Sequence, residues 1–559
     1  MATLFALEAF DQAGLDMHVL VTHQTGFSFL DGTGLTWNGA TYADVVMFEY
    51  DDGGPRQAWF GGDGVVLDAG QSQAVAGTAR GFVDLARSGT LWLPAWGVQG
   101  FAVPATAVSQ AIVSPDTADD AALLATILAG ADLLTLSSGA DVALGWAGDD
   151  VLRGGAGNDS LGGGAGGDLL DGGSGADTLT GGSGNDLYLV DQVGDRVCEA
   201  TVYGGTQDAG GVDTVRSPVH WSLAGDAGQT FVERLVLTGT RALRGTGNGQ
   251  PNRIEGNAGA NVLDGGPGAD TLVGGAGDDT YVVDDPGDRV LETASAPGAA
   301  DPGGVDMVRA AISFSLAASQ ATVRVENLHL AAPGPVNGTG NDLDNVILAG
   351  AGDNRIDGRG GTGDLVSYVS AGSAVSLDLR VTAVPQSTGG SGSDRIWNVE
   401  GLAGSRYADR LAGNALANML QGGAGADSLS GGGGRDTLHG GPGNDSLVGG
   451  PGADQFWLDG PLGTARVGNR DRIGDFLPAD DTFCLPREVF TAPSAGVLPA
   501  GAFVSANRPV AREPDDHILH DRDHGVVSYD ADGDGPLAAV PIALVGANLV
   551  LTAADFLVA

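Results

Sequence analysis

Lysine is absent from this chain of 559 residues, so its 27 basic residues are all arginine. Acidic residues number 70, and the formal net charge at pH 7 is −43. A chain so poor in positive charge has no basic face for nucleic-acid phosphates or for an anionic membrane surface. The acidity fits either a hydrated surface that favours solubility or a supply of ligands for cations.

We also expect no disulfide framework, no membrane span and no N-terminal secretory leader. Cys198 and Cys484 lie far apart and show no metal-binding or redox spacing, which argues against a disulfide framework. No apolar run reaches about 18 residues, so we expect no transmembrane helix. The first residues, MATLFALEAFDQAG, have no basic region and no long apolar region, so we expect no N-terminal signal peptide. Export would need another route.

Glycine is abundant, with 96 residues, and it recurs in a nine-residue repeat. From Ile127, seven blocks follow without an insertion: ILAGADLLT, LSSGADVAL, GWAGDDVLR, GGAGNDSLG, GGAGGDLLD, GGSGADTLT and GGSGNDLYL. Position four is glycine and position six aspartate in every block, and position eight is nearly always apolar. The aspartates of this first array are Asp132, Asp141, Asp150, Asp159, Asp168, Asp177 and Asp186.

Three further arrays follow, near Gly247, in a weaker form around GNDLDNVIL, and over Gly413–Trp457. Their intact aspartates are Asp270 and Asp279 in the second array and Asp427, Asp436, Asp445 and Asp454 in the fourth. The first block of each array carries asparagine at position six, at Asn252, Asn345 and Asn418. These substitutions predict weakened sites, with cation ligands dense in the first and fourth arrays and sparse between them.

A longer repeat overlies the arrays. A shift of 93 residues places Gly182–Asn248 on Gly275–Asn341 without a gap, so Tyr188 matches Tyr281. The segments between arrays alternate apolar and polar residues, which is typical of strands. Duplication explains this match and by itself indicates no chemistry.

Nine residues are enough for a tight turn and a three-residue strand. Glycine at positions one, two and four permits positive φ and close packing of successive turns, and the apolar residue at position eight points inward. Successive strands then lie on alternate sides of a flattened coil, and two repeats complete one coil. We therefore predict an all-β fold of several parallel β-roll arrays (Ca²⁺ β-solenoids) with β-rich N-terminal, inter-array and C-terminal segments.

Stacked aspartates would lie about one strand spacing apart, ~4.8 Å, and would repel one another without a cation. Ca²⁺ takes six to eight oxygens, whereas Mg²⁺ demands tight octahedral geometry and zinc prefers the Cys and His that the turns lack. We expect roughly eight to ten Ca²⁺ ions between turns of alternate repeats. The best carboxylate pairs are Asp141/Asp159, Asp150/Asp168, Asp159/Asp177, Asp168/Asp186, Asp427/Asp445 and Asp436/Asp454. Carbonyl ligands are expected from Gly155, Gly157, Gly164, Gly166, Gly173, Gly175, Gly423, Gly425, Gly432, Gly434, Gly441 and Gly443.

The blocks GGAGNDSLG, GGPGADTLV and GGPGNDSLV resemble the RTX (hemolysin-type) calcium-binding repeat, and the resemblance covers most of the chain from about Leu123. It implies a secreted, extracellular protein that leaves the cell through type I secretion machinery by an uncleaved C-terminal signal. The tail LTAADFLVA, with Asp555 before four apolar residues, is similar to such a signal, although an ordinary terminal strand is the alternative. Residues 460–559, with DRIGDFLPADDTFCL, resemble the C-terminal region of secreted bacterial RTX proteins.

The predicted organisation has eight parts. A short helix is expected over Asp116–Gly130, as a cap for the first roll. The parts are a small β-rich domain (1–120), β-roll 1 (121–189), an inter-array segment (190–246), β-roll 2 (247–283), a second inter-array segment (284–339), a degenerate array with strands (340–400), β-roll 4 (401–459) and the C-terminal region (460–559).

Two features near the C-terminus leave alternatives open. Asp530, Asp532 and Asp534 form DxDxDG, but position twelve of an EF-hand would be Pro541, so an acidic turn or a calcium site of another kind is favoured. His517, His520 and His524 could bind zinc or be polar surface residues. Strand alternation would place the first two on opposite faces.

Catalytic motifs are not found: HExxH and GxSxG are both missing, and we expect no enzyme. His18 and His23 could act as bases near Asp11, Asp16 or Asp31, but nothing ties them to a nucleophile. The favoured hypothesis is a calcium-binding protein that folds outside the cell, with a structural, adhesive or surface-associated role and a cell-surface or matrix partner. The alternative is an extracellular, hydrolase-like enzyme with an unrecognised N-terminal catalytic domain.

Overall fold

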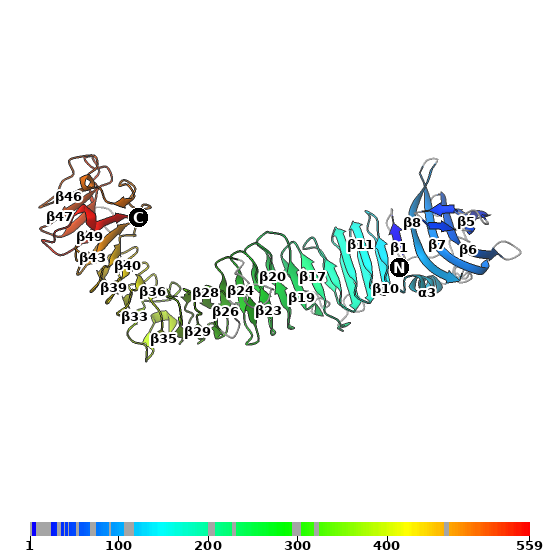
Figure 1. Ribbon diagram of the computed structural model, residues 1–559, viewed down its shortest axis with the longest axis horizontal. Helices are drawn as coiled ribbons and strands as arrows, with labels where there is room; N and C mark the ends of the chain where they lie inside the picture. The colour runs from blue at the N-terminus through cyan, green and yellow to red at the C-terminus, as the bar shows by residue number, and fades with distance from the viewer. Residues whose placement is uncertain are drawn as a thin grey trace. The chain divides into compact units, whose positions relative to one another are not determined.

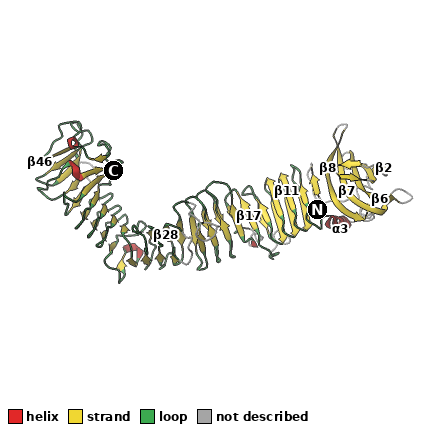
Figure 2. Cartoon of the chain, in the orientation of Figure 1, coloured by secondary structure: helices red, strands yellow, loops and turns green. Residues whose placement is uncertain are grey.

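Strands make up nearly all of the regular structure in the computed structural model (Figures 1 and 2). The structure describes the backbone of the strands and the helix within residues 1–121, and it describes residues 122–199, 207–225, 231–292, 303–317, 324–462 and 469–559 in full. The chain divides into two compact units, Met1–Asp279 with Gly287–Val290 and Thr280–Pro286 with Leu291–Ala559. No helix among the described residues is long and apolar enough to cross a membrane.

The first unit begins with an antiparallel sheet, which agrees with the predicted β-rich N-terminal segment. Its strands lie in the order β2 (Gln24–Leu30), β5 (Asp44–Asp51), β6 (Pro55–Leu67), β7 (Ala74–Ser88) and β8 (Leu91–Pro104), and β3 (Leu35–Trp37) pairs with β4 (Ala40–Tyr42). Helix α3 (Thr117–Ile127) follows within the predicted helical range. His18, His23, Asp11, Asp16 and Asp31 lie outside the described residues.

The end of the first roll is covered by a strand that the repeat pattern does not predict. Strand β1 (Thr3–Ala6) pairs antiparallel with β8 and parallel with β9 (Leu133–Thr135), the first strand of the roll. The N-terminal sheet therefore continues directly into the solenoid through hydrogen-bonded strands. A solenoid needs such a cover because its last coil would otherwise expose its core and its strand edge.

The first roll has the predicted coil of two repeats. Each strand pairs in parallel with the strand two blocks later, for example Leu152 with Leu170 and Leu161 with Leu179. These position-eight side chains are fully or almost fully buried. One sheet contains β9, β11 (Val151–Ala156), β13 (Leu169–Ser174) and β15 (Leu187–Leu189); the opposite sheet contains β10 (Val142–Ala147), β12 (Ser160–Ala165), β14 (Thr178–Ser183) and β16 (Arg196–Cys198).

The same parallel sheet continues through the inter-array segment of the first unit. Strand β15 pairs with β17, Leu187 with Thr214, although the chain between them is longer than two repeats. The continuing strands are β17 (Thr214–Ser217), β19 (Arg234–Leu237), β21 (Arg253–Glu255) and β23 (Thr271–Val273). Opposite them lie β18 (Trp221–Ser222), β20 (Arg244–Thr246) and β22 (Val262–Asp264). The strands thus keep their register although their spacing along the chain changes.

The second unit is built in the same way. One parallel sheet runs through β24 (Thr280–Val283), β26 (Met307–Ala310), β28 (Asn327–Leu330), β30 (Val346–Leu348), β32 (Leu365–Ser367), β36 (Gly401–Ala403), β38 (Met419–Gln421), β40 (Thr437–His439), β42 (Gln455–Trp457), β44 (Thr482–Leu485) and β50 (Phe556–Val558), with β45 (Gly496–Val497) antiparallel at its edge. A second sheet contains, in order, β27 (Phe314–Ser315), β29 (Gly338–Thr339), β31 (Arg355–Asp357), β35 (Ser393–Trp397) and β34 (Gln386–Ser387). A third sheet contains, in order, β33 (Ser376–Asp378), β37 (Arg410–Ala412), β39 (Ser428–Ser430), β41 (Ser446–Val448), β43 (Asp471–Ile473), β49 (Val540–Leu544), β48 (Val526–Tyr529), β47 (Ile518–Asp521) and β46 (Phe503–Ala506). Parallel pairing therefore extends into the C-terminal region as far as β43 with β49 and β44 with β50, whereas β49, β48 and β47 pair antiparallel.

An aromatic core ends the second unit. Phe476 stacks on Phe483 with 4.2 Å between ring centroids, and Phe483 stacks on Phe556 at 5.0 Å. Phe556 is fully buried in β50, which pairs with β44. The tail proposed as a secretion signal is therefore a paired, buried strand in the folded chain.

Candidate metal centre

The position-six aspartates form a buried column along each roll. In the first roll every one of them is at most 2% exposed. From Asp150 to Asp186, one carboxylate oxygen accepts a hydrogen bond from the backbone N–H of the aspartate two blocks earlier. Asp141 instead accepts from the N–H and the hydroxyl of Ser137. The N–H of Asp141 donates to Asp159 Oδ1 at 2.8 Å, and the N–H of Asp159 donates to Asp177 Oδ1 at 2.7 Å. The structure thus brings the predicted partners into direct contact.

The other predicted pairs have the same geometry. The donor N–H and acceptor Oδ1 are 2.8 Å apart in Asp150/Asp168, 2.7 Å in Asp168/Asp186, 2.8 Å in Asp427/Asp445 and 2.9 Å in Asp436/Asp454. Asp132 opens the column, and its N–H donates to Asp150 Oδ1 at 2.7 Å. In the second array, Asp270 and Asp279 accept from the N–H groups of Asn252 and Asn261, at 2.7 and 2.6 Å.

The second carboxylate oxygen of these aspartates, Oδ2, is the feature that makes the column a candidate metal site. Oδ2 is buried and has no hydrogen-bond partner among the described residues in Asp150, Asp159, Asp168, Asp177, Asp186, Asp427, Asp436, Asp445 and Asp454. A buried anionic oxygen without a donor is costly, and proteins compensate such an oxygen with a proton or a cation.

Glycine at position one, which we did not predict as part of the site, makes room for this oxygen. A Cβ atom on Gly154 would overlap Asp159 Oδ2 and would lie 2.5 Å from the carbonyl oxygen of Gly172. The unpartnered oxygen therefore lies beside a backbone carbonyl of the next coil. The signal in the sequence is glycine at the first position of most blocks.

The predicted glycines at positions two and four have the backbone that the pattern requires. Gly155 and Gly157 have φ of 105° and 123°, and a Cβ there would overlap backbone of the preceding coil. Positive φ also occurs at Gly164, Gly166, Gly173, Gly175, Gly423, Gly425, Gly432, Gly434 and Gly441, but Gly443 is not among the positive-φ residues. Glycine tolerates this conformation and this close approach without strain.

Burial raises the pKa of the column. The pKa rises from an ordinary 3.8 to about 7 for Asp150 and Asp168, and to about 6 for Asp159, Asp177 and Asp186. Loss of hydration is the main cause, and repulsion from neighbouring carboxylates adds to it. Burial has the same effect in the fourth array, where the pKa of Asp427 and Asp436 rises to about 6.

The donor set fits Ca²⁺. It consists of carboxylate oxygens and the backbone carbonyls of glycine-rich turns, and these turns contain no histidine or cysteine. Hard, oxygen-only ligands in flexible number suit Ca²⁺ better than zinc or copper. When bound, such an ion would neutralise the unpartnered oxygens of the column.

The column extends past the predicted arrays. Asp213 Oδ1 accepts from the N–H of Asp186 at 2.7 Å, Asp471 Oδ1 from Asp445 at 3.0 Å, and Asp481 Oδ1 from Asp454 at 3.0 Å. Sequence reasoning missed these residues because loops interrupt the period of nine. The available signal is an aspartate two residues before a buried apolar residue, as in Asp213 before Val215.

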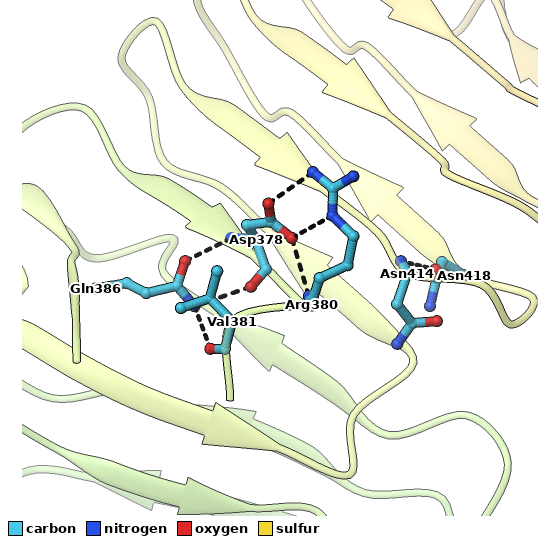
Figure 3. Close-up of polar contacts among 6 residues, drawn as sticks. All are labelled: Asp378, Arg380, Val381, Gln386, Asn414 and Asn418. Atoms are coloured by element: carbon cyan, nitrogen blue, oxygen red, sulfur yellow. Dashed lines mark hydrogen bonds and ion pairs between the residues drawn. The ribbon is translucent and has the colours of Figure 1, made fainter. Parts of the chain in front are cut away.

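Asparagine at position six forms hydrogen bonds within the protein through both its amide oxygen and its amide nitrogen. The amide oxygens of Asn252, Asn345 and Asn418 accept from the N–H four residues earlier, each at 2.7 Å. Their Nδ2 groups donate to the carbonyls of Val232 at 3.0 Å, Glu326 at 3.1 Å and Glu400 at 3.0 Å. Figure 3 shows Asn414 and Asn418 in this arrangement, beside the exposed Asp378–Arg380 pair. An amide supplies the donor that a carboxylate lacks.

The C-terminal histidines contact three different partners. His517 Nδ1 lies 2.9 Å from Asp530 O, His520 Nδ1 lies 3.2 Å from Ser505 Oγ, and His524 Nδ1 lies 2.9 Å from Asp521 Oδ2. His520 is fully buried, so it is not a polar surface residue. These contacts do not support a shared zinc site.

Comparison with known families agrees with the geometry. The model of the RTX calcium-binding nonapeptide repeat (four copies) matches residues 128–161, 162–193, 246–281, 339–362, 403–438 and 430–460. These segments coincide with the four arrays, including the degenerate third. No curated protein matches the chain.

Proposed function

We propose that this chain, whose four arrays match the RTX calcium-binding nonapeptide repeat, is a secreted protein that folds on binding Ca²⁺ outside the cell. The observation that carries the proposal is the buried column of position-six carboxylates, in which one oxygen of most residues has no hydrogen-bond donor. Such a column is unstable as bare anions at neutral pH. It becomes favourable when a cation lies between successive coils.

Each ion would be held between coils by position-six carboxylates and glycine carbonyls. In the first roll the carboxylate ligands are Asp132, Asp141, Asp150, Asp159, Asp168, Asp177 and Asp186; elsewhere they are Asp270, Asp279, Asp427, Asp436, Asp445 and Asp454. Glycine carbonyls at positions two and four complete the set, and those at position one, such as Gly172, extend it. This is the arrangement in which each aspartate lies between two ions.

Calcium can supply the stability that the thin core does not. From β9 to β15 the core consists of one apolar side chain for each strand, as at Leu152 and Leu161. Glycine makes ordering this part of the chain expensive in conformational entropy. Binding to the folded state alone contributes about 2.7 kcal/mol per site at a hundredfold excess over Kd. Several sites together would decide whether a roll folds.

This coupling suits export before folding. In calcium-poor cytosol the carboxylates would repel one another and keep the chain open for a type I exporter. The tail is available to such an exporter only before folding, because Phe556 and Val558 are buried in β50. Outside the cell, calcium would fold the chain for a structural, adhesive or surface-associated role.

A calcium titration of the full chain by far-UV circular dichroism tests the proposal. In excess EGTA at pH 7 we expect little strand signal, and calcium should restore it cooperatively. Magnesium at the same concentration is the control and should have little effect. A strand signal that is already complete in EGTA would contradict calcium-coupled folding.

A further inference from the structure

Three buried carboxylates meet at the end of the first roll. Asp186 precedes β15, Glu199 follows β16, and Asp213 precedes β17. Each offers an oxygen, and these oxygens lie within 4.8 Å of one another. Glu199 and Asp213 are 0% exposed, and Asp186 is 2% exposed. Glu199 belongs to none of the nine-residue blocks, so the repeat pattern does not account for it.

A loop explains how Glu199 reaches this place. Asp186 and Asp213 are neighbours in the column but lie 27 residues apart in the chain. The additional residues carry β16, which pairs with β14 in the opposite sheet, Cys198 beside Thr180. Glu199 comes directly after that strand, and its side chain is buried against the column. The loop therefore adds a third carboxylate where the regular roll has two.

Each carboxylate has one oxygen held by the protein and one that lacks a donor. Tyr188 donates its hydroxyl hydrogen to Glu199 Oε1, and the N–H of Asp186 donates to Asp213 Oδ1 at 2.7 Å. Asp186 Oδ1 accepts from the N–H of Asp168 at 2.7 Å. Glu199 Oε2, Asp186 Oδ2 and Asp213 Oδ2 are buried without a hydrogen-bond partner among the described residues. Such unpartnered oxygens on fully buried side chains require a proton or a cation to compensate them.

We propose that Asp186, Glu199 and Asp213 bind one Ca²⁺ ion at a site outside the nonapeptide pattern, which fastens the loop between β15 and β17 to the roll. The proposal rests on calcium binding by the roll, because Asp186 is also the last position-six carboxylate of the first array. The all-oxygen donor set disfavours zinc. Mg²⁺ usually keeps several of its waters, which a site without solvent exposure does not readily provide.

The 93-residue repeat carries these residues a second time. Asp279, Tyr281, Glu292 and Asp306 have the same spacing as Asp186, Tyr188, Glu199 and Asp213, although the residues just after each glutamate differ. In the second unit Tyr281 donates to Glu292 Oε1 at 2.6 Å, and Glu292 is buried. The glutamate and its tyrosine therefore recur together while the neighbouring loop sequence has diverged.

Calcium counting on the full-length chain tests the site. We expect Glu199→Gln to bind one equivalent of calcium less than the wild type, measured by equilibrium dialysis at saturating calcium. Glu255→Gln is the matched control, since Glu255 pairs with Arg253 at a partly exposed position, and it should keep the wild-type count. An unchanged count in Glu199→Gln would overturn the site and would leave Glu199 as a protonated acid.

Terbium luminescence gives a second readout that does not remove a ligand. Tyr188 contacts Glu199, so Tb³⁺ at this site should be excited by energy transfer from the Tyr188 ring. Tyr188→Phe should keep the calcium count and lose part of the tyrosine-sensitised emission. Unchanged emission would contradict the site even if Glu199→Gln failed to fold. A wild-type chain that binds no calcium would refute the proposed function as well, whereas loss of this site alone leaves the roll sites intact.

Discussion

Some turns have aspartate at position six of the repeat and others have asparagine. The buried polar atoms of these two side chains are satisfied in different ways. Asp159 leaves one buried oxygen without a donor, whereas Asn252 donates from that end of its side chain to Val232 O at 3.0 Å. The two side chains have nearly the same shape and differ in charge and in one pair of N–H donors. Under the proposed calcium binding, a single amide would take the place of an ion, and the residue at position six would decide which coils depend on calcium.

This difference divides the rolls into two kinds of segment. The first array has aspartate in all its blocks, whereas Asn252 and Asn261 open the second. Buried carboxylates require a cation or a proton, while the asparagine turns are satisfied by the protein itself. We therefore expect the coils at Asn252, Asn345 and Asn418 to need calcium least.

The largest expected effect concerns pH without calcium. The folded pKa of Asp150 and Asp168 is about 7 against an ordinary 3.8, so folding takes up protons. Stability from the protonated column should be fully present below about pH 4 and should be lost as pH rises through 6 to 7. Circular dichroism in EGTA should show strand content that falls over this window.

With saturating calcium this pH dependence should disappear above about pH 5, because the bound ion keeps the carboxylates ionised in the folded chain, as they are in the unfolded chain. The calcium-bound protein should lose stability only at lower pH, where the unfolded chain takes up protons near the ordinary carboxylate pKa of about 4. A strand signal in EGTA that rises between pH 4 and 7 would contradict the assignment of these buried carboxylates.

The second effect is the loss of one carboxylate from the column. Asp159→Ala should weaken two adjacent sites and lower the free energy of unfolding at saturating calcium by roughly 3 kcal/mol, about the contribution of one site. Denaturant unfolding measures this change. Asp523→Ala, at an exposed position outside the arrays, is the matched control and should change stability little. Equal losses in both variants would argue against a ligand role for Asp159.

Exchanging aspartate and asparagine at position six tests directly whether the amide takes the place of an ion. Asn252→Asp should destabilise the protein in EGTA by about 1–3 kcal/mol, because the carbonyl of Val232 keeps only its donor Asn248 Nδ2 and faces a carboxylate in place of the Asn252 amide. Asp159→Asn should lower the calcium count and reduce the fraction of strand lost in EGTA. Dialysis and circular dichroism measure the two quantities. If Asn252→Asp is neutral in EGTA, the amide does not replace an ion.

The smallest effect is expected at the exposed pair near the asparagine turn. Arg380 donates to Asp378 Oδ2 at 2.7 Å, but the Arg380 side chain is 65% exposed, so water screens the pair. Arg380→Ala should leave both the melting temperature and the calcium response unchanged within error. A shift as large as that of Asp159→Ala would show that the solenoid depends on surface ion pairs.

The sequence by itself determined the coil. A strict period of nine, with glycine, aspartate and an apolar residue in constant phase, implies two strands for each coil, a core at position eight and carboxylates aligned two blocks apart. The observed pairs Leu152/Leu170 and Asp159/Asp177 follow from that phase alone. Such local periodicity is visible without knowing which distant segments meet.

The tertiary structure decided where the column continues and what closes it. Asp213 and Asp471 join after loops of irregular length, Glu199 reaches the column from the opposite sheet, and β1 covers β9 from the beginning of the chain. Asn252 finds its acceptor, the carbonyl of Val232, 20 residues earlier. Those contacts depend on which strands become neighbours once loops are inserted, because strand register is set by packing and hydrogen bonding between coils. A period of nine residues does not specify that register.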